Sequence, residues 1–155
     1  MKRFIPFIII LFFSVSLAAT GAPIKPTKKD KCPVCGMFVY KYPDFIAEVI
    51  FKDGSHAVFD GTKDMFKYYF NLKKYDPKKK VADIVSLYVT DYYTLTLVDG
   101  FKAHYVLGSD ICGPMGRELI PFEKEADAKE FSIDHKGKSI KRFKDISYEM
   151  IKGLD

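Results

Sequence analysis

Each half of the chain contains short strand-like runs, a glycine turn and a helical pattern, and this repetition limits the fold more than any other feature. The first half has a β-type run over 45–51, a turn at Asp53-Gly54 and a second run over 57–59. Asp60-Gly61-Thr62 then suits a helix start, and the apolar spacing over 65–70 places its large side chains on one helical face. We therefore expect two strands followed by a helix.

The rest of the chain shows the same kinds of signal. Strand-like runs cover 84–89, 94–98 and 103–107, with a turn at Asp99-Gly100. Further along, we expect a helix over 123–131, a turn at Lys136-Gly137, a strand over 139–143, and a short helix that Ser147 caps and Gly153 ends.

Two sulfur-containing loops suggest a register for the repeat. Cys35-Gly36-Met37 begins the first half, and Cys112-Gly113-Pro114-Met115 would begin the second. In that register Gly54, Phe59 and Asp64-Met65 match Gly137, Phe143 and Glu149-Met150. A duplicated β-β-α-type unit follows, in which each half is too small to bury its own core. The sequence therefore predicts an α+β chain.

The first residues are typical of a targeting segment. Lys2 and Arg3 precede an apolar run from Phe4 to Leu17, and small residues follow at 18–21. The run is too short for a comfortable membrane span, so we expect a cleaved signal peptide over residues 1–21. A retained N-terminal anchor is the alternative.

The signal peptide would leave a polar leader and one domain. Residues 22–31 contain prolines and lysines without periodicity, which is typical of a flexible leader. Residues 32–155 are then long enough for a single domain. The net charge of +5 is small, and no basic stripe with interleaved aromatics indicates nucleic-acid binding. We interpret the run Lys78-Lys79-Lys80 as a solvated loop, while headgroups at the membrane surface or an acidic protein remain plausible partners for a basic exported protein.

The three cysteines cannot all pair within one chain. Cys32, Cys35 and Cys112 form an odd set in a compartment that permits disulfides, so at least one sulfur is free, in an intermolecular bond or on a metal. Thiolate and thioether sulfurs favour Cu(I) over hard cations. Cys35 and Met37 would face the same side of an extended segment, Cys32 is near enough to join them, and Met115 would add a sulfur from the second half. We therefore predict a Cu(I) site formed by Cys35, Met37, Met115 and Cys32.

The same sulfur residues are also compatible with different roles. Cys32 and Cys35 could form a disulfide, or a thioredoxin-like redox pair, although the β-type run that follows does not supply the helix such a pair needs. A zinc ribbon would need a second ligand pair, which the sequence lacks. Met37 and Met115 could instead fill the core. Cys112, His56 and His104 remain possible further ligands, and no motif for a hydrolase nucleophile or a phosphate loop occurs.

The motifs, taken in order, resemble the NosL family, the accessory proteins of nitrous oxide reductase. The first half contributes Cys32-Pro33-Val34-Cys35-Gly36-Met37, then Phe59-Asp60 before Asp64-Met65-Phe66. The second half contributes Gly108-Ser109, Pro114-Met115-Gly116, the segment 118–122, the segment 126–131 and Gly137. The resemblance covers nearly all of the chain after the targeting segment.

The resemblance implies a fold and a function. It implies an α+β fold of two related ββαβ units packed as one domain. It also implies a periplasmic Cu(I) metallochaperone, not an enzyme, that serves denitrification by delivering copper for maturation of nitrous oxide reductase through an inner-membrane ABC-type complex. The family's copper ligands map to Cys35, Met37 and Met115. Many members carry a lipidated Cys after the signal, whereas Ala19 is followed here by Thr20. Two alternatives remain, a thiol-disulfide oxidoreductase using Cys32 and Cys35, and a general copper-sequestering protein.

Overall fold

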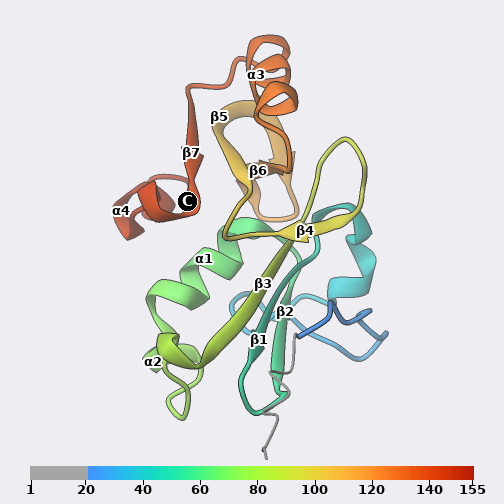
Figure 1. Ribbon diagram of the computed structural model, residues 1–155, viewed down its shortest axis with the longest axis vertical. Helices are drawn as coiled ribbons and strands as arrows, with labels where there is room; N and C mark the ends of the chain where they lie inside the picture. The colour runs from blue at the N-terminus through green and yellow to red at the C-terminus, as the bar shows by residue number, and fades with distance from the viewer. Residues whose placement is uncertain (1–20) are drawn as a thin grey trace, which may run out of the picture.

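The computed structural model describes residues 21–155, which form an α+β fold with two antiparallel sheets (Figure 1). The signal peptide predicted at residues 1–21 lies outside the described residues except for Gly21. None of the helices formed by residues 21–155 has the length and apolar character that crossing a membrane requires.

The first unit is a four-stranded sheet with a helix against it. Its strands are β1 (Ala47–Phe51), β2 (His56–Phe59), β3 (Ile84–Thr90) and β4 (Leu97–Asp99), in the order β2-β1-β3-β4. Between β2 and β3 lie α1 (Thr62–Phe70), α2 (Leu72–Tyr75) and the 3₁₀ turn η3 (Val81–Asp83), while η1 (Val39–Lys41) and η2 (Pro43–Phe45) precede β1. The predicted turn at Asp53-Gly54 joins β1 to β2, and Gly54 has the positive φ of 81° that such a tight turn needs.

The second unit repeats the plan with three strands. Its elements are β5 (His104–Gly113), β6 (Gly116–Phe122), α3 (Glu125–Asp134) and β7 (Ser139–Arg142), with η4 (Phe143–Asp145) and α4 (Tyr148–Lys152) after them. The sheet order β6-β5-β7 matches β2-β1-β3 of the first unit. The chain therefore contains two ββαβ units, and the predicted fold class is confirmed.

The register that we expected for the repeat is wrong. The segment Cys112-Gly113 ends β5, and Pro114-Met115 forms the turn between β5 and β6, so this sulfur loop does not begin the second unit. It matches the turn at Asp53-Gly54, which joins the first two strands of the first unit. Gly113 pairs with Gly116 across the turn, and Gly116 has a φ of 83°. Flexible glycines at both ends of a two-residue turn explain why a segment poor in strand-forming residues closes a hairpin.

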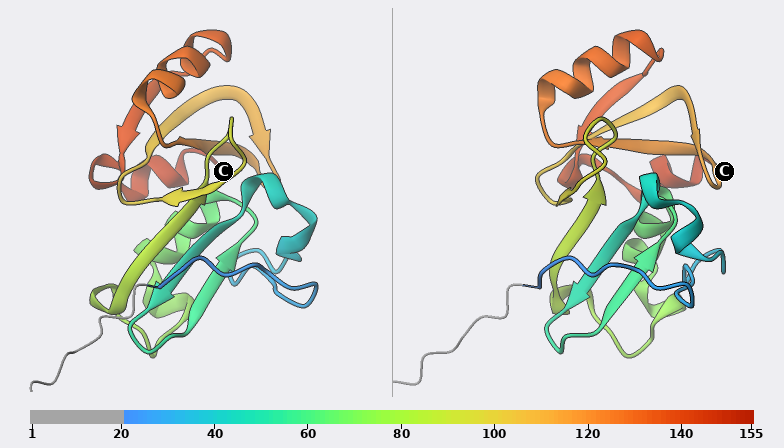
Figure 2. Two further views of the ribbon diagram at one scale, coloured as in Figure 1. Left: turned by 45° about the vertical axis from the view of Figure 1, so that its right-hand side comes forward. Right: turned by 90° about the vertical axis from the view of Figure 1, so that its right-hand side faces the viewer.

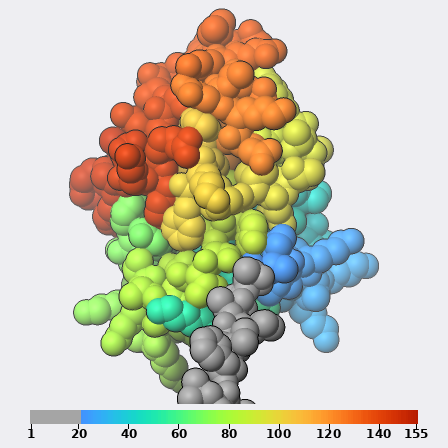
Figure 3. All heavy atoms as spheres, in the orientation of Figure 1, coloured from blue at the N-terminus to red at the C-terminus, as the bar shows by residue number. Residues whose placement is uncertain are grey.

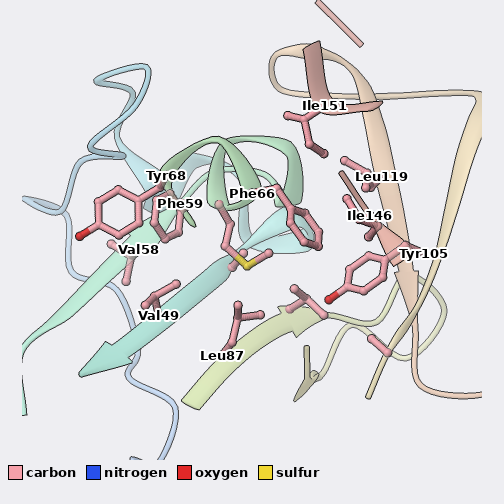
Figure 4. Close-up of a cluster of buried hydrophobic side chains, with 14 of the residues drawn as sticks. Val49, Val58, Phe59, Phe66, Tyr68, Leu87, Tyr105, Leu119, Ile146 and Ile151 are labelled. Atoms are coloured by element: carbon pink, nitrogen blue, oxygen red, sulfur yellow. The ribbon is translucent and has the colours of Figure 1, made fainter. Parts of the chain in front are cut away.

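The two units share one core. Figure 4 shows Val49, Phe59 and Phe66 of the first unit facing Tyr105 and Leu119 of the second, all of them buried. One cluster of buried side chains therefore draws on both units and forms the main core between them. A smaller cluster around Phe131 packs α3 onto the second sheet. In both views of Figure 2 the second unit lies above the first.

Hydrogen bonds fix both ends of the described chain, and one of them is the predicted cap at Ser147. Ser147 caps α4, because its side chain accepts a hydrogen bond from the backbone N–H of Met150. At the other end, the backbone N–H of Ile24 donates to Glu48 at 2.8 Å, and Tyr88 donates to the carbonyl of Gly21 at 2.9 Å. These contacts hold the beginning of the described chain against the first sheet.

Candidate metal centre

The two cysteines lie in a tight loop that precedes η1. The backbone N–H of Cys32 donates to the carbonyl of Met37 at 2.9 Å, and the N–H of Gly36 donates to the carbonyl of Cys32 at 2.9 Å. Gly36 has a φ of 80°, which side chains with a Cβ rarely adopt. The glycine therefore lets the chain fold back on itself so that both sulfurs reach the same side.

Two aspartates complete the cluster from the start of α1. Asp60 follows β2 and Asp64 lies in the first turn of α1, on opposite sides of the helix N-cap Gly61. One ligand atom from each of Cys32, Cys35, Asp60 and Asp64 lies within 4.8 Å of the others. These four residues, called the Cys-Asp cluster below, bring together two segments about 25 residues apart in the sequence.

Hydrogen bonds link each thiol to a carboxylate. The Cys35 Sγ donates to Asp60 Oδ1 at 3.2 Å, and the Cys32 Sγ donates to Asp64 Oδ2 at 3.4 Å. Among the described residues, the second oxygen of Asp60 is buried without a hydrogen-bond partner. A buried unpaired oxygen costs free energy, and a cation bound at the cluster would offset this cost.

Burial keeps both thiols protonated. It raises the pKa of the Cys35 thiol to about 12. Burial also raises the pKa of the Cys32 thiol well above its ordinary value, and the nearby charge of Asp64 adds to this effect. The aspartates lie at the N-terminal end of α1, where the helix dipole favours negative charge, and Lys67 Nζ lies 4.0 Å from Asp64 Oδ1. A cation entering the cluster would supply positive charge next to the sulfurs and so stabilise the thiolates.

A glutamate from the second unit supports the same helix start. The buried carboxylate of Glu118, on β6, accepts hydrogen bonds from the backbone N–H groups of Lys63 and Leu119. A Cβ at Gly61 would overlap the Glu118 Oε2, so a larger residue at the helix N-cap would displace the Glu118 carboxylate. Burial raises the pKa of Glu118 to about 8. The second unit thus fixes the segment that carries Asp60 and Asp64.

The four predicted ligands have different placements. Cys32 is buried and Cys35 is half-buried, and both belong to the Cys-Asp cluster. Half-buried Met37 closes the cysteine loop through its carbonyl, which accepts from the backbone N–H of Cys32. Met115 is exposed in the β5–β6 turn, where its carbonyl accepts from Lys63 Nζ at 2.8 Å. This bond ties the Met115 turn to the residue next to Asp64, and the two methionines stay predictions as ligands.

Asp60 and Asp64 were not among the ligands predicted from the sequence. A signal was present, since the sequence places Asp60 just before a predicted helix start and Asp64 just after it. The predicted set was restricted to soft sulfur donors, and carboxylates were therefore passed over.

The remaining sulfur and imidazole candidates lie outside the cluster. Cys112 is exposed on β5. His104 Nε2 lies 2.6 Å from Arg142, and His135 Nδ1 lies 3.0 Å from Asp110. Within residues 21–155, the Cys-Asp cluster is the group of His, Cys, Asp and Glu side chains close enough to hold a metal ion, and His56 does not belong to it.

The donor set can bind a soft or borderline metal ion. Two thiol sulfurs and two carboxylate oxygens suit Zn(II), whereas the sulfurs with neighbouring thioethers suit Cu(I). Redox catalysis is less well supported, because a reactive cysteine needs a lowered pKa. Here both thiols have raised pKa values and lie in a loop.

Comparisons with known proteins find similar solved structures and a similar curated protein. A solved structure described as the copper chaperone NosL from Shewanella denitrificans superposes with a TM-score of 0.71 at 23% identity, covering 83% of this chain and 98% of that one. The apo-NosL protein from Achromobacter cycloclastes is 24% identical, with a TM-score of 0.49 over 68% of this chain and 87% of that one. The copper-binding lipoprotein NosL of Stutzerimonas stutzeri is 28% identical over 137 residues, which is 83% of this chain and 68% of the relative.

The family model provides the decisive match, because it extends from the leader through both units into α4. The model named NosL matches residues 23–151, and this range contains all four members of the Cys-Asp cluster as well as the predicted ligands Met37 and Met115. This chain therefore belongs to the NosL family.

Proposed function

We propose that this protein is an exported metallochaperone that binds Cu(I) in the periplasm and hands it on. The observation that carries the proposal is the convergence of two thiols on two buried carboxylates, one of them with an unpaired oxygen. Membership of the NosL family supports copper as the metal, since the curated relative is named a copper-binding lipoprotein and the solved relative a copper chaperone.

The cysteine sulfurs would bind the ion, and the aspartate carboxylates would orient the cysteine side chains. Each thiol proton already points at a carboxylate, so loss of the protons would leave sulfur lone pairs facing a common centre. Binding of Cu(I) would displace these protons. Met37, next to the cysteine loop, and Met115, in the turn tied to Lys63, would supply thioethers.

The exposure of the donors suits transfer rather than permanent storage. Cys32 is only 1% exposed, whereas Met115 is 42% exposed. A partner's ligands can therefore approach from the Met115 side while the buried thiol still holds the ion. Ligand exchange of this kind would deliver copper to the inner-membrane ABC-type maturation complex and to nitrous oxide reductase.

Metal competition with matched cysteine variants tests the proposal. We expect the reduced protein to bind Cu(I) in clear preference to Zn(II), measured by competition with a chromophoric chelator for each ion. Cys35→Ser should weaken Cu(I) binding by more than about a hundredfold, which exceeds the 10–100-fold loss typical of residues that only support ligands. Cys112→Ser, the exposed control outside the cluster, should leave affinity unchanged. Equal or tighter Zn(II) binding would overturn the choice of copper.

A transfer assay separates delivery from sequestration. Copper-loaded protein would be mixed with copper-free nitrous oxide reductase, with and without the membrane complex, and the copper content of each would be measured after separation. Delivery predicts faster transfer from the loaded protein than from a small-molecule complex of equal copper affinity. Transfer that is no faster would favour the sequestering alternative.

A further inference from the structure

Four lysines line a cavity beside α2, although the run Lys78-Lys79-Lys80 suggested only a solvated loop. The cavity has a volume of about 480 Å³, and its charged lining consists of Lys73, Lys74, Lys79 and Lys80. Tyr69, Phe70, Asn71, Leu72 and Val81 complete the wall, so among the described residues no carboxylate lines it. Together with Lys78, these four lysines are called the lysine-rich end, and they lie at the lower left of Figures 1 and 3.

The positive charge of this region is concentrated. Residues 71–83 contain five lysines and two aspartates and so carry a formal charge of +3. Residues 32–155 as a whole contain 19 basic and 19 acidic side chains and are formally neutral. Within the part of the chain that the structure describes, Lys79 is the member of the lysine-rich end that forms an ion pair, with Asp53. The other four are exposed and remain available to an external anion.

Apolar side chains accompany the lysines. Val81 is 43% exposed and lines the same cavity as the lysines, directly after the lysine run in the chain. A cationic surface with an exposed aliphatic side chain fits a membrane interface, where the charges meet headgroups and the aliphatic group enters the interface shallowly.

The N-terminal part of the chain and Lys79 both meet the first sheet at the end of β1. Gly21 packs against Ile50, the residue before Phe51, and Lys79 Nζ lies 4.9 Å from the centroid of the Phe51 ring. The leader that follows Gly21 adds Lys25, Lys28, Lys29 and Lys31 against one acid, Asp30. Together with the leader, the lysine-rich end forms a positively charged surface, and the anionic headgroups of a membrane are complementary to it.

We propose that the lysine-rich end docks the domain on a membrane surface of anionic lipid headgroups. Docking would also orient the Cys-Asp cluster, because the cluster lies at the N-terminal end of α1 and the lysines follow its C-terminal end. At 1.5 Å per residue, the nine residues of α1 span about 13 Å. The cluster would therefore be held about this far from the lysine-rich end and the lipid. This inference does not depend on which metal the cluster binds.

Vesicle binding of the full chain tests the proposal. Binding to phosphatidylcholine vesicles reports any contribution of the apolar N-terminal run, and the additional binding to vesicles that also contain phosphatidylglycerol reports the lysines. Each lysine near an anionic surface contributes about fivefold to partitioning at low salt, so Lys73→Ala/Lys74→Ala/Lys80→Ala should lower the additional binding roughly a hundredfold. Lys79 is left intact because it pairs with Asp53. Lys124→Ala/Lys129→Ala/Lys136→Ala, around α3, removes equal charge at the far end and should have little effect.

A single tryptophan reports which end faces the lipid, since the chain contains none. The fluorescence of Val81→Trp should shift to the blue on anionic vesicles, whereas that of Ile133→Trp, at an 80% exposed position on α3, should not. Equal loss of binding in the two triple variants, or a shift in both tryptophan variants, would overturn the proposal. Displacement by inorganic phosphate at constant ionic strength would also overturn it, because that result identifies a small-anion pocket.

Discussion

The carboxylate of Glu118 in the second unit accepts the backbone N–H of Lys63 in the first turn of α1, the helix of the first unit. The bond crosses the junction between the units and holds the segment that carries Asp60 and Asp64. Lys63 also reaches the second unit through its side chain, which donates to the Met115 carbonyl. The geometry of the Cys-Asp cluster therefore depends on how the two units pack.

Glu118 predicts a fall in stability as the pH rises. Its pKa is raised to about 8 in the folded protein from an ordinary value of 4.5, so the folded state binds the proton more tightly than the unfolded state. The resulting stabilisation is complete below about pH 4.5 and is lost as the pH rises to about 8. Each unit of difference between the folded and unfolded pKa corresponds to about 1.4 kcal/mol of unfolding free energy. Glu118→Gln keeps an oxygen for Lys63 and Leu119 and removes the titration. Urea unfolding at pH 5 and pH 8 should show a smaller difference in unfolding free energy for this variant, and an equal difference would contradict the assignment.

Thiol labelling should separate the three cysteines. A pKa of about 12 at Cys35, against an ordinary 9.0, lowers its thiolate fraction at neutral pH by about a thousandfold. In the folded, metal-free protein, iodoacetamide at pH 8 should therefore label exposed Cys112 long before Cys35 or buried Cys32. Labelling in denaturant, followed by peptide mass spectrometry, gives the reference for each site. Rapid labelling of Cys35 in the folded protein would instead support the oxidoreductase alternative.

Asp60→Asn should weaken metal binding without weakening the metal-free fold. The substitution preserves size and replaces a buried carboxylate that has one unpaired oxygen, so the metal-free melting temperature should stay the same or rise. Loss of an anionic oxygen donor should reduce Zn(II) affinity by at least about tenfold and Cu(I) affinity by less, because Cu(I) relies on sulfur. Asp44→Asn, at an exposed position, is the control. An unchanged Zn(II) affinity would show that Asp60 does not contact the ion.

Periodicity and turn chemistry are local, and this explains what could be predicted from the sequence. The strand before Asp53-Gly54, the helix after Gly61 and the cap at Ser147 each depend on neighbouring residues, and the structure contains all three. The β5–β6 hairpin was missed because β5 continues through an irregularity between Leu107 and Cys112, and only pairing with β6 stabilises its glycine-rich end. Such pairing is a tertiary effect that overrides local preference.

The Cys-Asp cluster shows the same limit at the level of function. The loop that brings Cys32 and Cys35 together was visible in the sequence, because its residues are adjacent. The approach of Asp60 and Asp64 to that loop depends on packing of α1 against β1, β2 and β6, which no local pattern reveals.

Met115 tests whether both units bind one ion. The idea of a shared ion cannot rest on a sulfur loop at the start of each unit. Met115 lies in the β5–β6 turn and not at the start of the second unit. The hydrogen bond from Lys63 Nζ to the Met115 carbonyl does support it, since it ties that turn to the first turn of α1. Met115→Leu keeps volume and apolar character at an exposed position, so the metal-free melting temperature should not change.

Cu(I) affinity of the same variant should nevertheless fall by about tenfold or more, because a thioether donor is lost. Met65→Leu is the matched control: Met65 is fully buried in the shared core, so its substitution should change stability only slightly and leave Cu(I) affinity intact. Cu(I) should also raise the melting temperature of the unsubstituted protein more than that of Met115→Leu, because tighter binding to the folded state stabilises it more. If Met115→Leu binds Cu(I) as tightly as the unsubstituted protein, the first unit binds copper alone and the shared site must be abandoned.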